Sequence, residues 1–371
     1  MTKLKDITGK ALSGEWGADD ETGVGIPVLR TTNFTNEGIV NYENVVTRII
    51  TKKDISEKYL QSGDIIIEKS GGSDKQPVGR VIYFDGPENT YLFNNFTGLL
   101  RVRDKNEWFP RYVFYSLFAN YKKGGTRPFE NKTTGLHNLK TDDYVSRYEI
   151  TEIPLHKQIA ICAQLDQILK VINLRRKELS NLDDLIKARF VEMFGDAYSN
   201  PRGLPVLEWD DVFNTTTGKL DSNAATENGA YPFFTCSKEA LRIDKYAFDQ
   251  EALLLAGNNA AGKYDVKHYN GKFNAYQRTY VLSLKQEWSY ALFKYQLEDK
   301  LVYLQQQSLG GLTKYLTMKI LGDLTFLLPS MDEQKQFEDF VAQIDKSKAT
   351  VQKALDETQL LFDSLMQQYF G

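Results

Sequence analysis

The sequence has few of the residues that build metal and redox sites. It contains only two cysteines and three histidines in 371 residues. Cys162 and Cys236 lie far apart and form no CxxC pair, which argues against a disulfide framework and a zinc ribbon. His137, His156 and His268 are equally scattered. We therefore expect no metal site in this chain.

Long apolar runs are also missing. No run approaches the roughly 18 residues that a membrane-spanning helix needs, and the opening MTKLKDIT has no apolar signal region. We therefore expect a cytoplasmic protein that makes no membrane contact. The chain has a formal net charge of −3 and so lacks the excess of basic residues found in many nucleic-acid-binding proteins. Composition by itself therefore argues mildly against nucleic-acid binding.

What the chain does contain is enough apolar material for more than one core. Hydrophobic residues make up 42% and aromatic residues 12% of the sequence. Since domains commonly hold about 100–200 residues, this length predicts two or three of them. Two local stretches, residues 121–140 and 263–278, are rich in lysine and arginine. Such stretches are able to contact phosphates even in an acidic protein.

The chain repeats itself at an offset of 176 residues, where residues 158–195 align without a gap with residues 334–371. In both copies the apolar residues step by alternating fours and threes, the spacing of a heptad seam. Each copy therefore predicts a helix of about 35 residues, or about 50 Å. The identical pairs include Gln158/Gln334, Ile168/Ile344, Leu179/Leu355, Leu185/Leu361, Phe194/Phe370 and Gly195/Gly371.

The ends of both predicted helices carry helix signals. Prolines precede them, the second copy has a capping-box pattern in Ser330 and Glu333, and both copies end in Phe-Gly. A single helix with so narrow an apolar stripe is unstable in water, so it needs a partner helix. The simplest partner is the other copy, which predicts an antiparallel coiled coil whose seam is interrupted by polar residues such as Arg175.

A segment rich in Gly, Tyr, Phe, Thr and Asn precedes each helix. The two segments correspond weakly: residues 4–7 align with 209–212, 26–30 with 230–235, and 93–102 with 273–282. Short β-branched runs separated by Gly and Asn predict an α+β fold with a largely antiparallel sheet. The expected layout has an internal pseudo-two-fold repeat: globular domains at 1–152 and 197–328, each followed by a long helix, at 153–196 and 329–371.

Catalytic motifs are not recognisable. Residues 257–263 read GNNAAGK, close to a phosphate-binding loop, but Tyr264 stands where a magnesium-binding hydroxyl is required. Neither an NPPY-type methyltransferase motif nor a Gly-rich cofactor loop is found, and no carboxylate cluster followed by lysine suggests a nuclease. We therefore expect no catalytic residue.

Two dissimilar segments, each followed by a similar long helix, make the chain resemble the specificity subunits of type I restriction-modification systems. The resemblance covers the whole chain. The helix starts Ile153-Pro154-Leu155-His156-Lys157-Gln158 and Leu328-Pro329-Ser330-Met331-Asp332-Glu333-Gln334 are similar to the family's Pro-x-x-x-Gln pattern. The first departs from it in having Lys157 where an acidic residue is common.

The resemblance implies that each globular segment is a target recognition domain that reads one half of a split double-stranded DNA sequence. It also implies that the helices form a spacer and a docking surface for two modification (adenine methyltransferase) subunits, which restriction subunits join. S-adenosylmethionine, ATP and Mg would then belong to these partner subunits, with no cofactor in this chain. Sharing of phosphate contacts with the partners would explain the near-neutral charge.

Loop position and side-chain type indicate the candidate base-reading residues. Asn94-Asn95-Phe96 and Tyr276-Gln277-Arg278 occupy matching positions in the two segments, and Asn, Gln and Arg make bidentate contacts to adenine and guanine. They are also ordinary polar residues at strand ends. The full candidate set is Arg30, Thr31, Asn33, Lys69, Ser70, Asn94, Asn95, Arg127, Lys132, Thr133, Thr134, His137, Thr235, Ser237, Asn258, Asn259, Lys263, Gln277, Arg278, Ser308 and Lys314.

Two other interpretations remain open on the sequence. The chain could be the recognition part of a type II methyltransferase-nuclease, against which the lack of a cofactor motif argues. It could also be a coiled-coil scaffold whose globular parts bind other proteins. DNA binding, tested with and without a modification subunit, separates the three interpretations.

Overall fold

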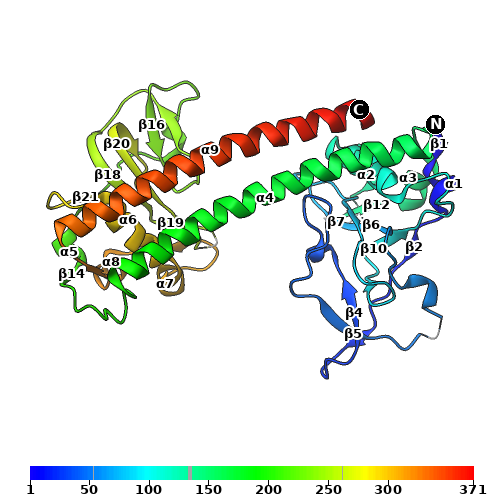
Figure 1. The fold of residues 1–371 in the computed structure, drawn as a ribbon, viewed down its shortest axis with the longest axis horizontal. Coiled ribbons are helices and arrows are strands. Elements are labelled where there is room, and N and C mark those ends of the chain that lie inside the picture. The colour runs from blue at the N-terminus through cyan, green and yellow to red at the C-terminus, as the bar shows by residue number, and fades with distance from the viewer. Residues whose placement is uncertain (53, 133–135, 261) are drawn as a thin grey trace. The chain divides into compact units, whose positions relative to one another are not determined.

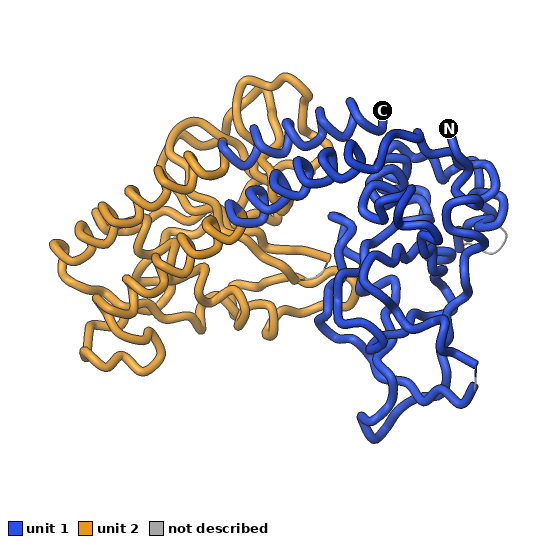
Figure 2. Tube along the Cα trace, turned by 45° about the vertical axis from the view of Figure 1, so that its right-hand side comes forward, with its two compact units in different colours: residues 1–175, 354–371 blue, residues 176–353 orange. Residues whose placement is uncertain are grey.

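The computed structural model describes residues 1–52, 54–132, 136–260 and 262–371. These form two compact units (Figure 2): unit 1 is Met1–Arg175 with Ala354–Gly371, and unit 2 is Arg176–Lys353. Each unit holds one β-rich domain and part of the two long helices, α4 (Leu155–Phe194) and α9 (Met331–Phe370) (Figure 1). The predicted α+β class with two long packed helices is confirmed.

The two long helices each span 40 residues, somewhat more than the predicted length. At the start of α9 the predicted capping box is present. The amide of Ser330 donates to Glu333 Oε2 at 3.0 Å, and the amide of Glu333 donates to Ser330 Oγ at 3.4 Å. Gly195 follows α4 with a φ of +81°, the left-handed conformation that suits glycine at a helix C-terminus. The sequence signals for the helix ends are therefore correct.

Within unit 1 the two helices pair in an antiparallel manner. The Tyr369 hydroxyl donates to Gln164 Oε1 at 3.0 Å. Farther along α4, the Arg175 guanidinium donates to the Ala354 carbonyl and the Thr358 hydroxyl. The residue numbers of the partners in α9 thus decrease as those in α4 increase, which defines an antiparallel pair. Arg175, which interrupts the apolar seam, is thus accommodated because the facing helix offers it oxygen acceptors.

Within unit 2 the same antiparallel pairing holds. Lys348 Nζ lies 2.6 Å from Asp183 Oδ1, and the rings of Phe190 and Phe337 are 5.8 Å apart. The hydrophobic cluster around Phe190 also includes Phe194 and Leu292, so the end of α4 packs against both α9 and the β-rich domain of this unit. The predicted antiparallel coiled coil is confirmed in each unit.

The β-rich domain of unit 1 contains two four-stranded sheets, in the orders β2-β10-β6-β8 and β3-β5-β4-β9, and a three-stranded sheet, β11-β12-β7. Strand β1 pairs with β13, which shortly precedes α4. The bounds are β1 (Thr2–Lys3), α1 (Leu4–Thr8), β2 (Leu12–Ser13), β3 (Ala18–Asp19), β4 (Ile26–Leu29), β5 (Val46–Ile49), β6 (Ile65–Glu68), β7 (Ser70–Gly72), β8 (Val81–Tyr83), β9 (Leu92–Phe93), β10 (Thr97–Leu100), α2 (Pro110–Lys122), β11 (Glu130–Asn131), β12 (His137–Leu139), α3 (Thr141–Arg147) and β13 (Glu149–Ile150).

The β-rich domain of unit 2 is built around a six-stranded sheet in the order β15-β21-β18-β20-β16-β17. Strand β14 pairs with β23, and β19 pairs with β22. The bounds are β14 (Val206–Glu208), α5 (Trp209–Val212), β15 (Phe213–Thr217), β16 (Tyr231–Phe234), β17 (Leu241–Ile243), β18 (Phe248–Ala256), β19 (Asn258–Asn259), β20 (Val266–Ala275), β21 (Thr279–Leu284), α6 (Tyr290–Asp299), α7 (Leu301–Gln307), β22 (Lys314–Tyr315), α8 (Met318–Gly322) and β23 (Thr325–Leu327).

The internal repeat extends through these domains. Helices α1 and α5 are equivalent, as the sequence alignment predicts. Strand β4 pairs parallel with β9 and antiparallel with β5, and β16 pairs in the same way with β20 and β17. One alignment is wrong by two residues: Phe93 corresponds to Ala275, not to Phe273, because β4 and β16 end against Phe93 and Ala275 respectively. Weak similarity between short strands leaves such a shift undetected in sequence.

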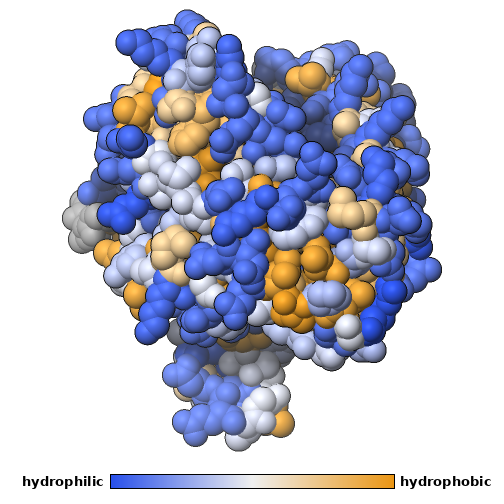
Figure 3. Space-filling model, turned by 90° about the vertical axis from the view of Figure 1, so that its left-hand side faces the viewer, coloured by the Kyte–Doolittle hydropathy of each residue, from blue (hydrophilic) through white to orange (hydrophobic). Residues whose placement is uncertain are grey.

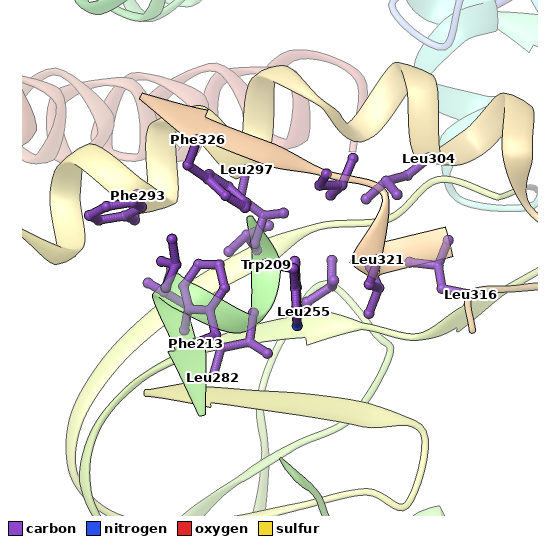
Figure 4. Packing of buried hydrophobic residues seen from close by; sticks show 14 of the residues in the cluster. Trp209, Phe213, Leu255, Leu282, Phe293, Leu297, Leu304, Leu316, Leu321 and Phe326 are labelled. Carbon is purple, nitrogen blue, oxygen red and sulfur yellow. The ribbon is translucent and has the colours of Figure 1, made fainter. Parts of the chain in front are cut away.

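Each domain encloses its own apolar core. In unit 2 the core surrounds Trp209, which is fully buried and whose indole Nε1 donates to Thr215 Oγ1 at 2.9 Å. Figure 4 shows its neighbours coming from the sheet, α6, α7 and β23. The core of unit 1 includes Leu29, Phe34, Leu60, Ile66, Ile82, Phe84, Phe93 and Leu99. These cores hold in register the strands whose ends carry the exposed turns described below.

On the face shown in Figure 3, hydrophilic residues predominate and apolar residues gather in limited patches. None of the helices in the described part of the chain is both long enough and apolar enough to cross a membrane.

Candidate nucleic-acid interface

Each unit presents one tight turn at an equivalent place. Turn 1 (residues 94–97) joins β9 to β10, and turn 2 (residues 276–279) joins β20 to β21. The Thr97 amide donates to the Asn94 carbonyl at 3.1 Å, and the Thr279 amide donates to the Tyr276 carbonyl at 2.8 Å. Both are therefore four-residue turns closed by a hydrogen bond, with two residues at the tip.

The first residue of each turn is anchored in the same way. The Asn94 amide donates to the Leu29 carbonyl at the end of β4, at 3.0 Å. The Tyr276 amide donates to the Phe234 carbonyl at the end of β16, at 2.9 Å. Both turns thus start from the parallel strand pair that the two domains share.

The third residue of each turn is anchored to the residue that directly follows a second strand, β6 or β18. The Lys69 amide donates to the Phe96 carbonyl and the Gly257 amide donates to the Arg278 carbonyl, both at 2.8 Å. The turn backbones are therefore held at both ends. Asn94-Asn95-Phe96 and Tyr276-Gln277-Arg278 therefore occupy matching positions, as predicted from the sequence.

A glycine packs directly against each turn. A Cβ atom on Gly14 would lie 2.2 Å from the carbonyl oxygen of Phe93, the residue before turn 1, and 2.1 Å from that of Asn94. One on Gly218 would lie 1.8 Å from the carbonyl oxygen of Ala275, the residue before turn 2, and 2.7 Å from that of Tyr276. Real Cβ atoms do not approach oxygen so closely, so any side chain here would displace the turn. The same close approach occurs in both domains, so the two copies of the repeat hold their turns in the same position.

The two tip residues of each turn project outward. Asn95 and Phe96 are exposed in turn 1, and Gln277 and Arg278 are exposed in turn 2. Phe96 is 52% exposed, which is unusual for a phenylalanine on a well-packed domain. Because their backbones are fixed, these side chains are presented from rigid positions.

An open pocket of about 530 Å³ adjoins turn 1. Lys69 lines it and donates from Nζ to Ser13 Oγ at 2.9 Å. Partial burial lowers the pKa of Lys69, while the nearby Asp142 carboxylate favours its charged form. The pocket thus offers a cation, hydroxyls and amides beside the exposed tip of the turn, with one carboxylate at its margin.

Turn 2 has a different set of neighbours. Gln277 Nε2 lies 3.4 Å from Asp221 Oδ2, and the Cys236 thiol lies 3.4 Å from the Arg278 carbonyl oxygen. The adjoining β19-β22 pair places Asn258 opposite Tyr315. Where turn 1 has the Lys69 side chain, turn 2 has the side-chain-free Gly257.

A second open pocket in unit 1, of about 560 Å³, is strongly basic. We call it the basic pocket; its cationic residues are Lys75, Lys122, Lys123 and Arg127. Four cations around one open pocket favour an anionic ligand such as phosphate. Beside it, Lys132 forms an ion pair with Asp74 at 2.7 Å, and this pairing lowers the pKa of Asp74.

The structure brings together many of the sequence-predicted residues. Arg30 and Thr31 directly follow Leu29, whose carbonyl anchors turn 1, and Ser237 follows β16, which anchors turn 2. The Lys263 amide donates to Asn259 Oδ1 at 3.4 Å. The predicted residues on or beside the two turns are Arg30, Thr31, Lys69, Ser70, Asn95, Ser237, Asn258, Asn259, Lys263, Gln277, Arg278 and Lys314. Arg127 and Lys132 lie at the basic pocket instead.

Five predicted residues are buried within the fold. All five are at most 7% exposed, so we assign them supporting roles: Asn33, Asn94, His137, Thr235 and Ser308. His137 Nδ1, for example, lies 3.1 Å from Glu130 Oε2, and Ser308 Oγ donates to the Gln305 carbonyl at 2.7 Å. Residue type and turn position do not distinguish a side chain that points inward from one that points outward.

Asn33 illustrates the supporting role. Its Oδ1 accepts from the Arg30 amide at 2.9 Å, and its Nδ2 donates to the Asn41 carbonyl at 3.0 Å. It therefore holds the loop that carries Arg30. Two further predicted residues, Thr133 and Thr134, lie outside the described residues.

Six exposed or half-exposed residues that line the turn-1 pocket are not among the sequence-predicted candidates: Ala11, Ser13, Phe96, Asn138, Thr141 and Asp142. The strand period offers a signal for Asn138, because it alternates with the inward-facing His137 on β12. For Phe96 the sequence offers a weaker signal of exposure, namely its place between Asn95 and the start of a predicted strand.

The phosphate-loop-like segment has a different use. Its first amide, that of Gly257, is hydrogen-bonded to the Arg278 carbonyl, and Asn258 and Asn259 form β19. This segment therefore supports turn 2, and in the described residues that follow it, 262–275, the chain enters strand β20 and not the helix of a nucleotide-binding loop. Within the described ranges no group of three or more His, Cys, Asp or Glu side chains is placed to hold a metal ion.

Comparisons with known proteins agree with this architecture. A family model described as "Type I restriction modification DNA specificity domain" matches residues 1–183 and 201–358. The type I restriction enzyme EcoDI specificity subunit of Escherichia coli is 37% identical over 154 residues, which are 40% of this chain and 33% of that protein. The match thus spans about a third of that relative's length.

A solved structure shares the fold across the whole chain. The type I restriction-modification S subunit from M. genitalium superposes with a TM-score of 0.60 at 15% sequence identity, covering 100% of this chain and 95% of that one. The family match covers both halves of the internal repeat, including both turns and most of both long helices. This chain belongs to the family of type I restriction-modification DNA specificity domains.

Proposed function

We propose that this chain reads a bipartite DNA sequence as the specificity subunit of a type I restriction-modification complex. The observation that carries the proposal is the pair of equivalent turns, one in each unit, with Asn95 and Phe96 exposed on one and Gln277 and Arg278 on the other. A repeated scaffold with different residues at the reading position suits two half-sites of different sequence.

The proposed division of labour follows the repeat. Residues 1–152 and 197–328 are the two target recognition domains, and residues 153–196 and 329–371 are spacer helices. The helices set the separation of the half-sites and serve as docking surfaces for two modification subunits. Restriction subunits join through that complex.

The chemistry of methylation and cleavage belongs, in this proposal, to the partners. S-adenosylmethionine is held by the modification subunits, and ATP and Mg act with the restriction subunits. This chain contributes recognition and geometry and acts in the cytoplasm, where its DNA target is found. The basic pocket contributes phosphate contacts, and the partner subunits supply the remaining positive charge that a chain of net charge −3 lacks.

The direct test is DNA binding by the full-length chain, alone and with a co-expressed modification subunit, followed by sequencing of methylated sites in cells. We expect a single bipartite motif that requires both proteins for methylation, and no methylation or cleavage by the purified chain. Methyl transfer by the chain alone would support the type II interpretation. Absence of sequence-selective binding in both preparations would support a protein scaffold.

A further inference from the structure

The two turns present different chemistry from the same backbone frame. At the second position of the turn, Asn95 corresponds to Gln277, and at the third, Phe96 corresponds to Arg278. The carbonyl of the third residue is bound to the chain in both turns, so neither turn can reorient freely. Differences between the two half-sites should therefore come from these side chains.

The second position carries an amide in both turns. Asn and Gln each pair in a bidentate manner with the N6 and N7 atoms of adenine in the major groove. Gln277 is exposed and has only a long, 3.4 Å contact with Asp221, so its amide is available to a ligand.

The third position differs in kind. An arginine pairs with O6 and N7 of guanine, whereas a phenylalanine makes apolar contact with the methyl group of thymine. Arg278 is exposed, and in the described part of the chain its guanidinium has no hydrogen-bond or ion-pair partner. Phe96 is half exposed, next to the polar pocket that Lys69 and Ser13 line.

Neighbouring turn residues are spaced suitably for neighbouring base pairs. Consecutive Cα atoms lie about 3.8 Å apart, and base pairs stack about 3.4 Å apart. A two-residue tip can therefore address two adjacent base pairs.

We propose that turn 2 reads an adenine and an adjacent guanine through Gln277 and Arg278, whereas turn 1 reads an adenine and an adjacent thymine through Asn95 and Phe96. This inference rests on the proposed function. It assigns one guanine of the target to the half-site of residues 197–328, and one thymine to the half-site of residues 1–152.

The test uses the full-length chain with its co-expressed modification subunit and a pool of duplex DNA with a randomised centre. Bound duplexes are sequenced for the native chain and for Arg278→Ala, Gln277→Glu and Phe96→Ala. We expect Arg278→Ala to lose one guanine of one half-site and to weaken binding to the native site roughly 5- to 150-fold. Gln277→Glu should change the neighbouring adenine to cytosine, since a carboxylate accepts from cytosine N4.

Phe96→Ala should relax one thymine in the other half-site and leave the first half-site unchanged. Lys219→Ala is the matched control: it removes an exposed cation near turn 2 and should leave every base preference unchanged. If the native chain selects a bipartite motif that these variants do not alter, the inference fails while the proposed function stands. If the native chain selects no motif, both fail.

Discussion

The side-chain oxygen of Gln158 accepts a hydrogen bond from the backbone amide of Phe109, the residue that precedes α2, at 2.8 Å. Its counterpart in the repeat, Gln334, accepts in the same way from the amide of Ser289, which precedes α6, at 3.0 Å. Both glutamines are at most 1% exposed. The identical glutamine in the two long helices therefore ties each helix to the first turn of a helix in its own domain.

Replacing this glutamine should destabilise unit 1. In Gln158→Leu the Phe109 amide and the Glu107 carbonyl, which Gln158 binds at 2.8 Å, lose their partner in a buried site. We expect a loss on the order of 3 kcal/mol, since each unpaired buried group costs about 1–3 kcal/mol. Urea unfolding followed by circular dichroism measures it. Gln167→Leu, the same change at an exposed position of α4, should shift the free energy by less than about 0.5 kcal/mol; equal losses would refute the anchoring role.

The capping box of α9 makes stability depend on pH. The Ser330 hydroxyl and then the Arg202 guanidinium, 2.8 Å away, lower the pKa of Glu333 from its ordinary value of 4.5. Because its pKa is lowered in the folded chain, the ionised Glu333 carboxylate stabilises the fold at pH values above its ordinary pKa. This contribution is lost as pH falls through the lowered pKa.

We therefore expect the native chain to be more stable than Glu333→Gln at neutral pH, with the gap closing as pH falls through the lowered pKa of Glu333. Thermal unfolding across a pH series measures the gap. Asp332→Asn, in the same first turn, removes a charge without changing the Ser330 contacts. A gap for Glu333→Gln that is independent of pH would contradict the assignment.

Phosphate contacts at the basic pocket should affect affinity without affecting sequence choice. Lys122→Gln removes one exposed cation of the pocket and should reduce the slope of log affinity against log salt by about 1, with the selected motif unchanged. DNA-binding titrations over a range of salt concentrations measure the slope. Lys105→Gln, an exposed lysine near the other end of α2, is the control and should leave the slope unaltered. A changed motif in Lys122→Gln would assign base reading to this pocket.

The helices should act as a ruler between the half-sites. Four helical residues inserted after Ser180, with four more after Thr350 in α9 to keep the pair in step, lengthen both helices by about 6 Å. Since DNA rises about 3.4 Å per base pair, the unread spacer should grow by one or two base pairs while both half-sites stay the same. Methylated-site sequencing in cells reads the spacer directly.

An insertion containing Gly-Pro at the same positions is the control, because it interrupts the helix and should abolish assembly with the modification subunits. An unchanged spacer in the helical insertion, with activity retained, would show that the helices do not set the separation.

The long helices could be predicted from sequence because their information is local. A heptad seam, Ser330 and Glu333 at one end, and Gly195 at another are short-range signals that favour paired helices with these ends. The repeat of Gln158 and Gln334 was also visible, but its role was not, since their partners Phe109 and Ser289 lie about 45 to 50 residues away in the chain.

The composition of the candidate interface was decided by tertiary structure. The sequence predicts Asn94 and Asn95 equally as base-reading residues, but the fold buries Asn94, the first residue of turn 1, and exposes Asn95 and Phe96. Gly257, which in the sequence belongs to an apparent phosphate-binding loop, instead donates its backbone amide to the Arg278 carbonyl and so supports turn 2. Residue types and their order determine which helices and strands form, but which side chains face outward depends on how distant strands pack, and only the folded domain specifies that packing.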